Sequence, residues 1–177
     1  MRKSTSRPIL KGGDELFNVG PVINFYYSVL EMIEDNDKPL ALLLGCTKHK
    51  PYSKSFIHRK IISMLEKHLL NDYVQQYIIG EPLVVCPREM ETYYPAAHYE
   101  FPPERLGHLG RDIFIKRLRK FFMKCEGHHY EYILFAPNHH KNIILTACKG
   151  IISPTIIPYN IYKLPDLLNI IKKFQTR

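Results

Sequence analysis

The sequence lacks the features that mark membrane-spanning, secreted and metal-finger proteins. No apolar run approaches the roughly 18 residues that a membrane-spanning helix needs. The basic start, Met1–Ser4, is not followed by a continuous apolar stretch, so we expect neither a signal peptide nor a membrane anchor. The four cysteines form no C-x-x-C pair and match no zinc or iron–sulfur spacing. We therefore expect a cytoplasmic protein with reduced thiols.

Internal repeats and low-complexity tracts are also absent, which excludes a repeat array and a long disordered tract. With 177 residues, of which 45% are hydrophobic and 24% charged, the chain is long enough for one globular domain and too short for two comfortable ones. We expect residues 1–177 to form this domain, with residues 1–18 as a basic arm or an edge segment. The net charge of +8 favours phosphate-rich partners.

Nine histidines raise the question of a metal site. His128–His129 and His139–His140 are adjacent pairs, and neighbouring residues on regular elements point apart. The sequence therefore predicts polar loop histidines at these positions, with no metal site and no cofactor.

The order of helical and extended patterns predicts an α/β domain. Helical periodicity marks residues 21–33, 57–69, 111–125, 142–148 and 165–174. Strands are predicted at 40–44, 74–79, 83–85 and 130–135, with an extended segment at 151–157. The alternation predicts a three-layer sandwich, in which helices cover both faces of a central, mainly parallel sheet. Residues 87–110, which hold four prolines and several tyrosines, are expected to form a long, structured functional loop.

The segment from Gly45 to His58 is the most informative part of the sequence. It begins where the buried strand ends and finishes one turn into a helix that Ser55 caps. Ligands bind at the carboxyl ends of strands in open α/β sheets, and helix dipoles and nearby lysines there would stabilise a thiolate at Cys46. Ser55 and His58 are three positions apart on the helix and can face the same space. A cysteine with a histidine in reach is the minimum arrangement for nucleophilic catalysis. An inert core thiol beside a simple helix cap is the alternative.

Two ordered motifs resemble the core catalytic domain of the archaeosine synthases. The first is the spacing Cys-x-x-x-Lys-Pro-Tyr-x-x-Ser-x-x-His, which runs from Cys46 to His58; the family normally has proline where this chain has Gly45. The second is the block Glu-Pro-Leu-Val-Val-Cys-Pro-Arg-Glu at residues 81–89, which continues into Tyr-Pro-Ala-Ala-His-Tyr-Glu at residues 94–100. The resemblance covers roughly residues 20 to 110.

This resemblance implies a fold similar to that of the uracil-DNA glycosylases, which suits a pocket for an extruded base. It implies the attachment of free lysine to the nitrile of 7-cyano-7-deazaguanine in tRNA, after which a radical-SAM lyase releases archaeosine. The full-length enzymes carry transglycosylase-like and RNA-binding PUA domains around this core. We therefore expect tRNA and free lysine as partners, together with a separate chain that supplies those domains.

The resemblance also suggests catalytic roles for four residues. Cys46 would add to the nitrile to give a thioimidate, which the lysine amine then displaces. His58 would carry the proton. Lys50 would lower the thiolate pKa or hold the incoming carboxylate, and Ser55 would orient His58 or donate to the nitrile nitrogen.

The remaining candidate residues would bind the substrate. Glu89 would read the two adjacent N–H groups of the guanine-type edge, and Arg88 would contact a phosphate. Tyr52, Tyr94 or His98 would stack on the base once it has left its own stack. The basic face of residues 111–124 would contact tRNA. Each of these residues has a plain scaffold role as its alternative.

Two other functions remain open at this point. A non-catalytic tRNA-binding subunit, or a paralogue of archaeosine synthase, would retain the pocket without the chemistry. A uracil-DNA-glycosylase-like enzyme would use the same fold, although the sequence shows no water-activating motif of that class. Fold likeness alone does not give function.

Overall fold

A five-stranded sheet forms the middle layer of the protein, for which the computed structural model describes residues 7–177. The strands lie in the order β4 (Val84–Pro87), β3 (Val74–Gly80), β2 (Leu40–Gly45), β6 (Glu131–Phe135) and β7 (Thr155–Ile156). Neighbouring strands are parallel except for β3 and β4, which form an antiparallel pair. The first six residues of the predicted basic arm lie outside the described part of the chain.

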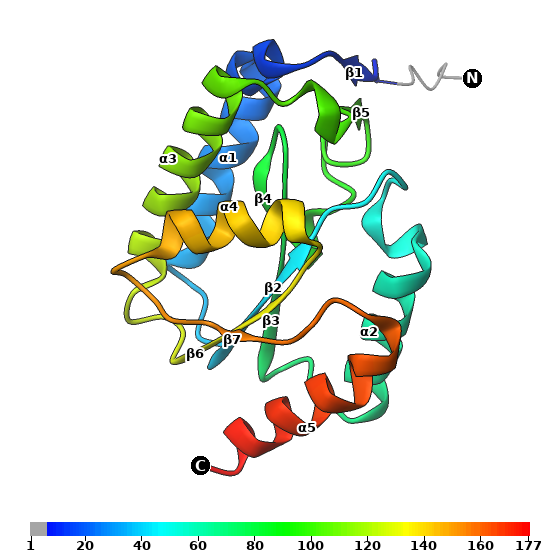
Figure 1. Cartoon of the computed structure of the whole chain (residues 1–177), viewed down its shortest axis with the longest axis vertical. Coiled ribbons are helices and arrows are strands. Elements are labelled where there is room, and N and C mark those ends of the chain that lie inside the picture. The colour runs from blue at the N-terminus through cyan, green and yellow to red at the C-terminus, as the bar shows by residue number, and fades with distance from the viewer. Residues whose placement is uncertain (1–6) are drawn as a thin grey trace, which may run out of the picture.

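Helices cover both faces of this sheet (Figure 1). The first layer holds α1 (Gly20–Ile33), α3 (His108–Cys125) and α4 (Asn138–Cys148), and the second holds α2 (Phe56–Lys67) and α5 (Leu164–Gln175). The predicted three-layer α/β sandwich is therefore confirmed. Among residues 7–177, none of the helices combines the length and the apolar composition that a bilayer crossing requires.

Strand β2 is the centre of the core. All six of its residues are buried, because helices pack on both of its faces and a parallel strand in that position must be apolar throughout. Gly45 pairs with Ile79 of β3, and Leu44 pairs with Phe135 of β6. The carboxyl ends of these three strands consequently meet at one edge of the sheet. The loops that follow them bring distant parts of the sequence together there.

The predicted long loop contains more regular structure than expected. A two-residue strand β5 (Tyr99–Glu100) pairs in parallel with β1 (Leu10–Lys11), so part of the expected N-terminal arm is an edge strand. Short 3-10 turns form η3 (Arg88–Met90) and η4 (Pro103–Arg105) in the same loop. Two further 3-10 turns lie outside this loop. They are η1 (Asp14–Asn18), which precedes α1, and η2 (Tyr52–Lys54), which precedes α2.

Helix α4 begins four residues earlier than the sequence predicts. The prediction that His139 and His140 are loop residues is therefore wrong, because both lie in the first turn of α4 after Pro137. Proline directly before the first turn lacks an N–H that the helix would leave unpaired, which makes it a favourable start signal. The asparagine and histidines that follow it interrupt the apolar periodicity, so the sequence pattern indicates the helix only from residue 142.

Several basic residues of α3, which we expected to contact tRNA, are engaged within the fold. Arg117 donates to the carbonyl oxygen of Phe17 at 2.6 Å, and Lys124 forms an ion pair with Glu34. Arg119 donates to carbonyl oxygens at the end of α4. These side chains tie α3 to its neighbours, so a phosphate-binding role of this face would rest on fewer cations than the sequence indicates.

Candidate active site

Cys46 follows directly on β2 and is the most accessible thiol of the protein. It is half-buried, whereas Cys86, Cys125 and Cys148 are buried. A side chain at Gly80 would occupy the space of Cys46, since a Cβ atom there would lie 2.3 Å from its Sγ. The glycine at the end of the neighbouring strand therefore makes the room in which the thiol sits.

His140 is the hydrogen-bonding partner of this thiol. Its Nε2 lies 3.5 Å from the Sγ of Cys46 and 3.2 Å from the Oε2 of Glu81. Burial lowers the pKa of His140, but the negative charges of Cys46 and Glu81 outweigh burial and hold that pKa above its ordinary value. The arrangement therefore favours a proton on Nε2, between the sulfur and the carboxylate.

Glu81 joins both histidines of the pair in α4. The Nε2 of His139 lies 3.2 Å from its Oε1, and the carboxylate is only 1% exposed. Burial raises the pKa of Glu81, but the hydrogen bonds from His139 and His140 are stronger and lower it below the ordinary value. The turn that presents Glu81 leads into Val84, whose φ of 73° is rarely adopted by a β-branched residue. Such strain occurs preferentially at functional sites.

Glu81, His139 and His140 also form a donor set that could hold a divalent metal. Their ligand atoms all lie within 4.8 Å of one another, and two imidazoles with one carboxylate are typical zinc ligands. The sequence-based reasoning missed this set because Glu81 lies about 60 positions from the histidines. The carboxylate is equally well satisfied by the two imidazole N–H groups, so the geometry requires no metal.

A cavity of about 550 Å³ opens beside Cys46 and His140. Its other walls are residues 46–50 of the loop after β2 and residues 99–104, so the predicted residues Cys46 and Lys50 both line it. The Nζ of Lys50 lies 4.5 Å above the ring of Tyr99 and donates to the carbonyl oxygen of Thr47. Burial lowers the pKa of Lys50, while attraction to Cys46 opposes this effect. The cavity therefore combines a thiol, an imidazole and an ammonium group.

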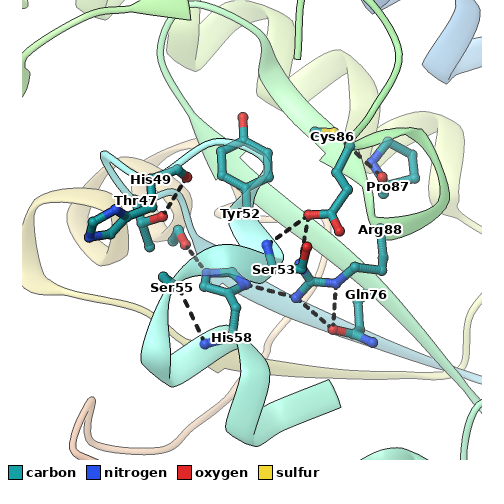
Figure 2. Close-up of polar contacts among 12 residues, drawn as sticks. Thr47, His49, Tyr52, Ser53, Ser55, His58, Gln76, Cys86, Pro87 and Arg88 are labelled. Carbon is teal, nitrogen blue, oxygen red and sulfur yellow. Dashed lines mark hydrogen bonds and ion pairs between the residues drawn. The ribbon is translucent and has the colours of Figure 1, made fainter. Parts of the chain in front are cut away.

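Ser55 and His58 do not line the cavity. Figure 2 shows the hydrogen bonds of His58 with Ser55 and Arg88. The Oγ of Ser55 accepts a hydrogen bond from the backbone N–H of His58, which confirms Ser55 as the N-cap of α2. The ring of His58 is 2% exposed, and both of its nitrogens are engaged, with the carbonyl oxygen of Gly45 and with Arg88. The structure thus does not bring the imidazole of His58 to the thiol of Cys46.

Arg88 and Glu89 have partners within the protein. The guanidinium group of Arg88 donates to Gln76, Glu91 and His58. The Oε2 of Glu89 accepts from Gln75 at 2.8 Å. Neither residue lines the cavity at Cys46. Arg88 is held as part of the scaffold, and Glu89 pairs with Gln75 and Lys38.

None of the predicted stacking residues lines the cavity at Cys46. Tyr52 is 1% exposed, and its hydroxyl group lies 2.6 Å from that of Tyr99, so it supports the cavity wall from behind. Tyr94 donates to the carbonyl oxygen of Pro8 and lines a different hollow of about 530 Å³. The ring of His98 packs against Tyr94 at 5.6 Å between centroids. Tyr99 is the aromatic residue that lines the cavity at Cys46 together with Phe101.

Comparison with known proteins gives relatives for most of the chain. Residues 22–150 match the family model described as "Domain of unknown function (DUF5591)". The chain is 31% identical over 102 residues to a protein named archaeosine synthase subunit alpha from Thermoplasma acidophilum, which covers 58% of this chain and 20% of that protein. It is 42% identical over 79 residues to the protein of that name from Methanosarcina acetivorans, which covers 45% of this chain and 12% of the relative.

A third relative and one solved structure complete the comparison. The protein named archaeosine synthase from Haloferax volcanii is 36% identical over 66 residues, or 36% of this chain and 10% of that protein. The alignments thus span a fifth or less of the curated relatives. The crystal structure of AF0587, a protein of unknown function, matches 83% of this chain and 49% of its own with a TM-score of 0.58 at 21% identity, which shows the shared fold. Since the family model matches well over half of its length, the chain belongs to the DUF5591 family and is a domain of the archaeosine synthase type.

Proposed function

We propose that this domain performs the covalent step of archaeosine-type tRNA modification, in which lysine is attached to the nitrile of 7-cyano-7-deazaguanine in tRNA. One observation carries the proposal. The Sγ of Cys46 lies 3.5 Å from the Nε2 of His140 at the wall of a cavity of about 550 Å³. Two relatives are named archaeosine synthase subunit alpha. A thiol beside an imidazole supplies a nucleophile that can attack a nitrile, which is the reaction that the family resemblance implies.

The first step is the addition of the thiol to the nitrile. The Sγ of Cys46 forms a bond to the nitrile carbon, and the thiol proton passes through Nε2 of His140 to the nitrile nitrogen, which gives a thioimidate. Glu81 holds His140 in place and stabilises its protonated form. The ammonium group of Lys50 favours the thiolate, because a nearby positive charge lowers the free energy of a developing negative charge.

The second step releases the sulfur. The side-chain amine of lysine attacks the thioimidate carbon, the carbon–sulfur bond breaks, and an amidine remains on the base. The amine proton returns to Cys46 through His140, so the enzyme regains its starting state and all atoms balance. In this scheme His140 takes the proton-carrying role that the sequence analysis gave to His58.

The cavity has the groups that the substrates need. Glu100 and Glu104 line the wall formed by residues 99–104, and the ring of Tyr99 in the same wall is 2% exposed and packs against Lys50. Carboxylates accept hydrogen bonds from the two adjacent N–H groups of a guanine-type edge. We therefore assign base recognition to this wall instead of Glu89. The tRNA body would be held by a partner chain, since the relatives are named as subunits and are several times longer than their aligned parts.

The proposal is tested by incubating the chain with lysine and nitrile-bearing tRNA, alone and with candidate partner chains. Wild-type protein should give a lysine–base adduct in hydrolysed tRNA, Cys46→Ala should give none, and Cys86→Ala should retain it as a matched cysteine control. Binding of tRNA without adduct in every combination would instead support a non-catalytic tRNA-binding subunit.

A further inference from the structure

The peptide group that precedes Cys46 is held from both sides. Its N–H donates to the carbonyl oxygen of Ile79 in β3 at 2.9 Å. In a trans peptide the carbonyl points the opposite way, and the carbonyl oxygen of Gly45 accepts a hydrogen bond from Nε2 of His58 at 3.0 Å. The ladder between β2 and β6 has its last pair at Leu44, and Pro137 beyond it carries no N–H. His58 therefore supplies a donor where the neighbouring strand has ended.

Arg88 fixes the state in which His58 makes this bond. An N–H of the guanidinium group donates to Nδ1 of His58 at 2.7 Å, so Nδ1 must be the acceptor and Nε2 must carry the hydrogen. Burial, followed by repulsion from Arg88, lowers the pKa of His58 to about 4. A ring that is neutral at physiological pH, with both nitrogens occupied, is a fixed hydrogen-bond relay.

The relay continues into the second motif of the sequence (Figure 2). The Oε1 of Gln76 in β3 accepts from Nε and Nη2 of Arg88, at 3.0 and 2.8 Å. Glu91 accepts from Nη1 of Arg88 at 3.2 Å and from the backbone N–H of Ser53 at 3.0 Å. The guanidinium group is thereby oriented by two buried acceptors, and Glu91 also ties it to the loop that carries Cys46.

We propose that His58 is a positioning residue, which holds the peptide before Cys46 so that the thiol faces His140 and the cavity. The effect of His58 on catalysis rests on the proposed function. Its effect on the position of the Cys46 thiol does not. Arg88 assists by selecting the tautomer of His58. The two sequence motifs are therefore joined by an Arg88–His58–Gly45 relay, and the histidine of the first motif acts through the backbone.

Glutamine is the variant that separates a positioning role from a proton-carrying role. A glutamine amide offers one donor and one acceptor, as neutral imidazole does, but it cannot exchange protons near neutral pH. We compare wild type, His58→Gln and His58→Ala by the alkylation rate of Cys46 with iodoacetamide across pH and by the rate of lysine–base adduct formation. His58→Gln should keep both rates within about threefold of wild type and leave the pH profile unchanged, while His58→Ala should lose tenfold or more in alkylation.

Two results would overturn the inference. The first is a folded His58→Gln protein that loses as much adduct formation as His58→Ala at an unchanged alkylation rate, since that indicates proton transfer by His58. The second is a His58→Ala protein that alkylates at the wild-type rate. If His58→Ala does not fold, Arg88→Lys replaces it, and we expect severalfold slower alkylation because a lysine cannot hold Gln76 and His58 together. Alkylation is independent of the nitrile reaction, so failure of the proposed function leaves this comparison decisive.

Discussion

The packing of Gly80 against Cys46 gives the sharpest prediction about the site. Replacing Gly80 with alanine would place a methyl group 2.3 Å from the Sγ and 2.5 Å from the Cβ of Cys46. Ordinary contact begins at 3.4 Å, so the two groups must separate by about 1 Å. Rotation of the cysteine side chain moves Sγ but leaves Cβ in place. The backbone at Cys46 must therefore shift, against the hydrogen bond that its N–H donates to Ile79 and the one that His58 donates to the carbonyl oxygen of Gly45.

Two opposing effects decide the size of the change. Alanine restricts the unfolded chain more than glycine does, which stabilises by about 0.4–1 kcal/mol at a compatible position. Overpacking of a tight site costs about 1–3 kcal/mol, and at Gly80 it should outweigh the gain. We expect a net loss in the free energy of unfolding, measured by urea denaturation, together with slower alkylation of Cys46. The control is Gly20→Ala at the start of α1, where no heavy atom lies within 4 Å and alanine should be neutral or stabilising. Unchanged stability and unchanged alkylation in Gly80→Ala would refute the reasoning.

Three further predictions follow from the electrostatics. Glu81→Gln leaves the imidazoles of His139 and His140 without their carboxylate and should cost about 3–5 kcal/mol of unfolding free energy in urea; a cost below about 1 kcal/mol would contradict the buried pairing. Lys50→Met removes the ammonium group attracted to Cys46 and should slow the alkylation of Cys46 at neutral pH, whereas a rate identical to wild type would exclude this role. His58 titrates near pH 4 in the folded state and near 6.5 when unfolded, so the unfolded state binds more protons between these values and stability falls as pH drops through them. Wild type should lose up to about 3 kcal/mol more than His58→Gln between pH 7 and pH 4, and parallel curves would show that His58 is not held neutral.

The architecture was predictable from local patterns because each main element turns an apolar run or an apolar face toward the core. The apolar run of β2 and the periodic faces of α1, α3 and α5 each indicated one structure, and each is present. The short strands β1 and β5 were not predicted, since two residues carry no periodicity and their pairing depends on segments that lie about 90 positions apart. The start of α4 was missed because polar residues fill its first turn.

The candidate site was predictable only in part, because its residues come from segments that lie far apart in the sequence. Cys46 was identified at the end of a clear strand and Lys50 in the motif that follows it, and the structure has both at the cavity. His140 and Glu81 were not identified, because their meeting with Cys46 depends on how β3 and α4 flank β2. His58 was assigned a role from its nearness in sequence. Its ring, however, is directed to Gly45 and Arg88, a direction that three-residue spacing on a helix does not determine.

The identity of the nucleophile is tested most directly by trapping the first intermediate. The protein is incubated with 7-cyano-7-deazaguanine in the absence of lysine, and its intact mass and tryptic peptides are measured. Because thiol addition to a nitrile expels no leaving group, we predict a gain equal to the whole mass of the nitrile, located on the peptide that contains Cys46 and missing from Cys46→Ala. A Cys46→Ala protein that still forms the lysine–base product on tRNA, or an adduct located on another residue, would contradict the account.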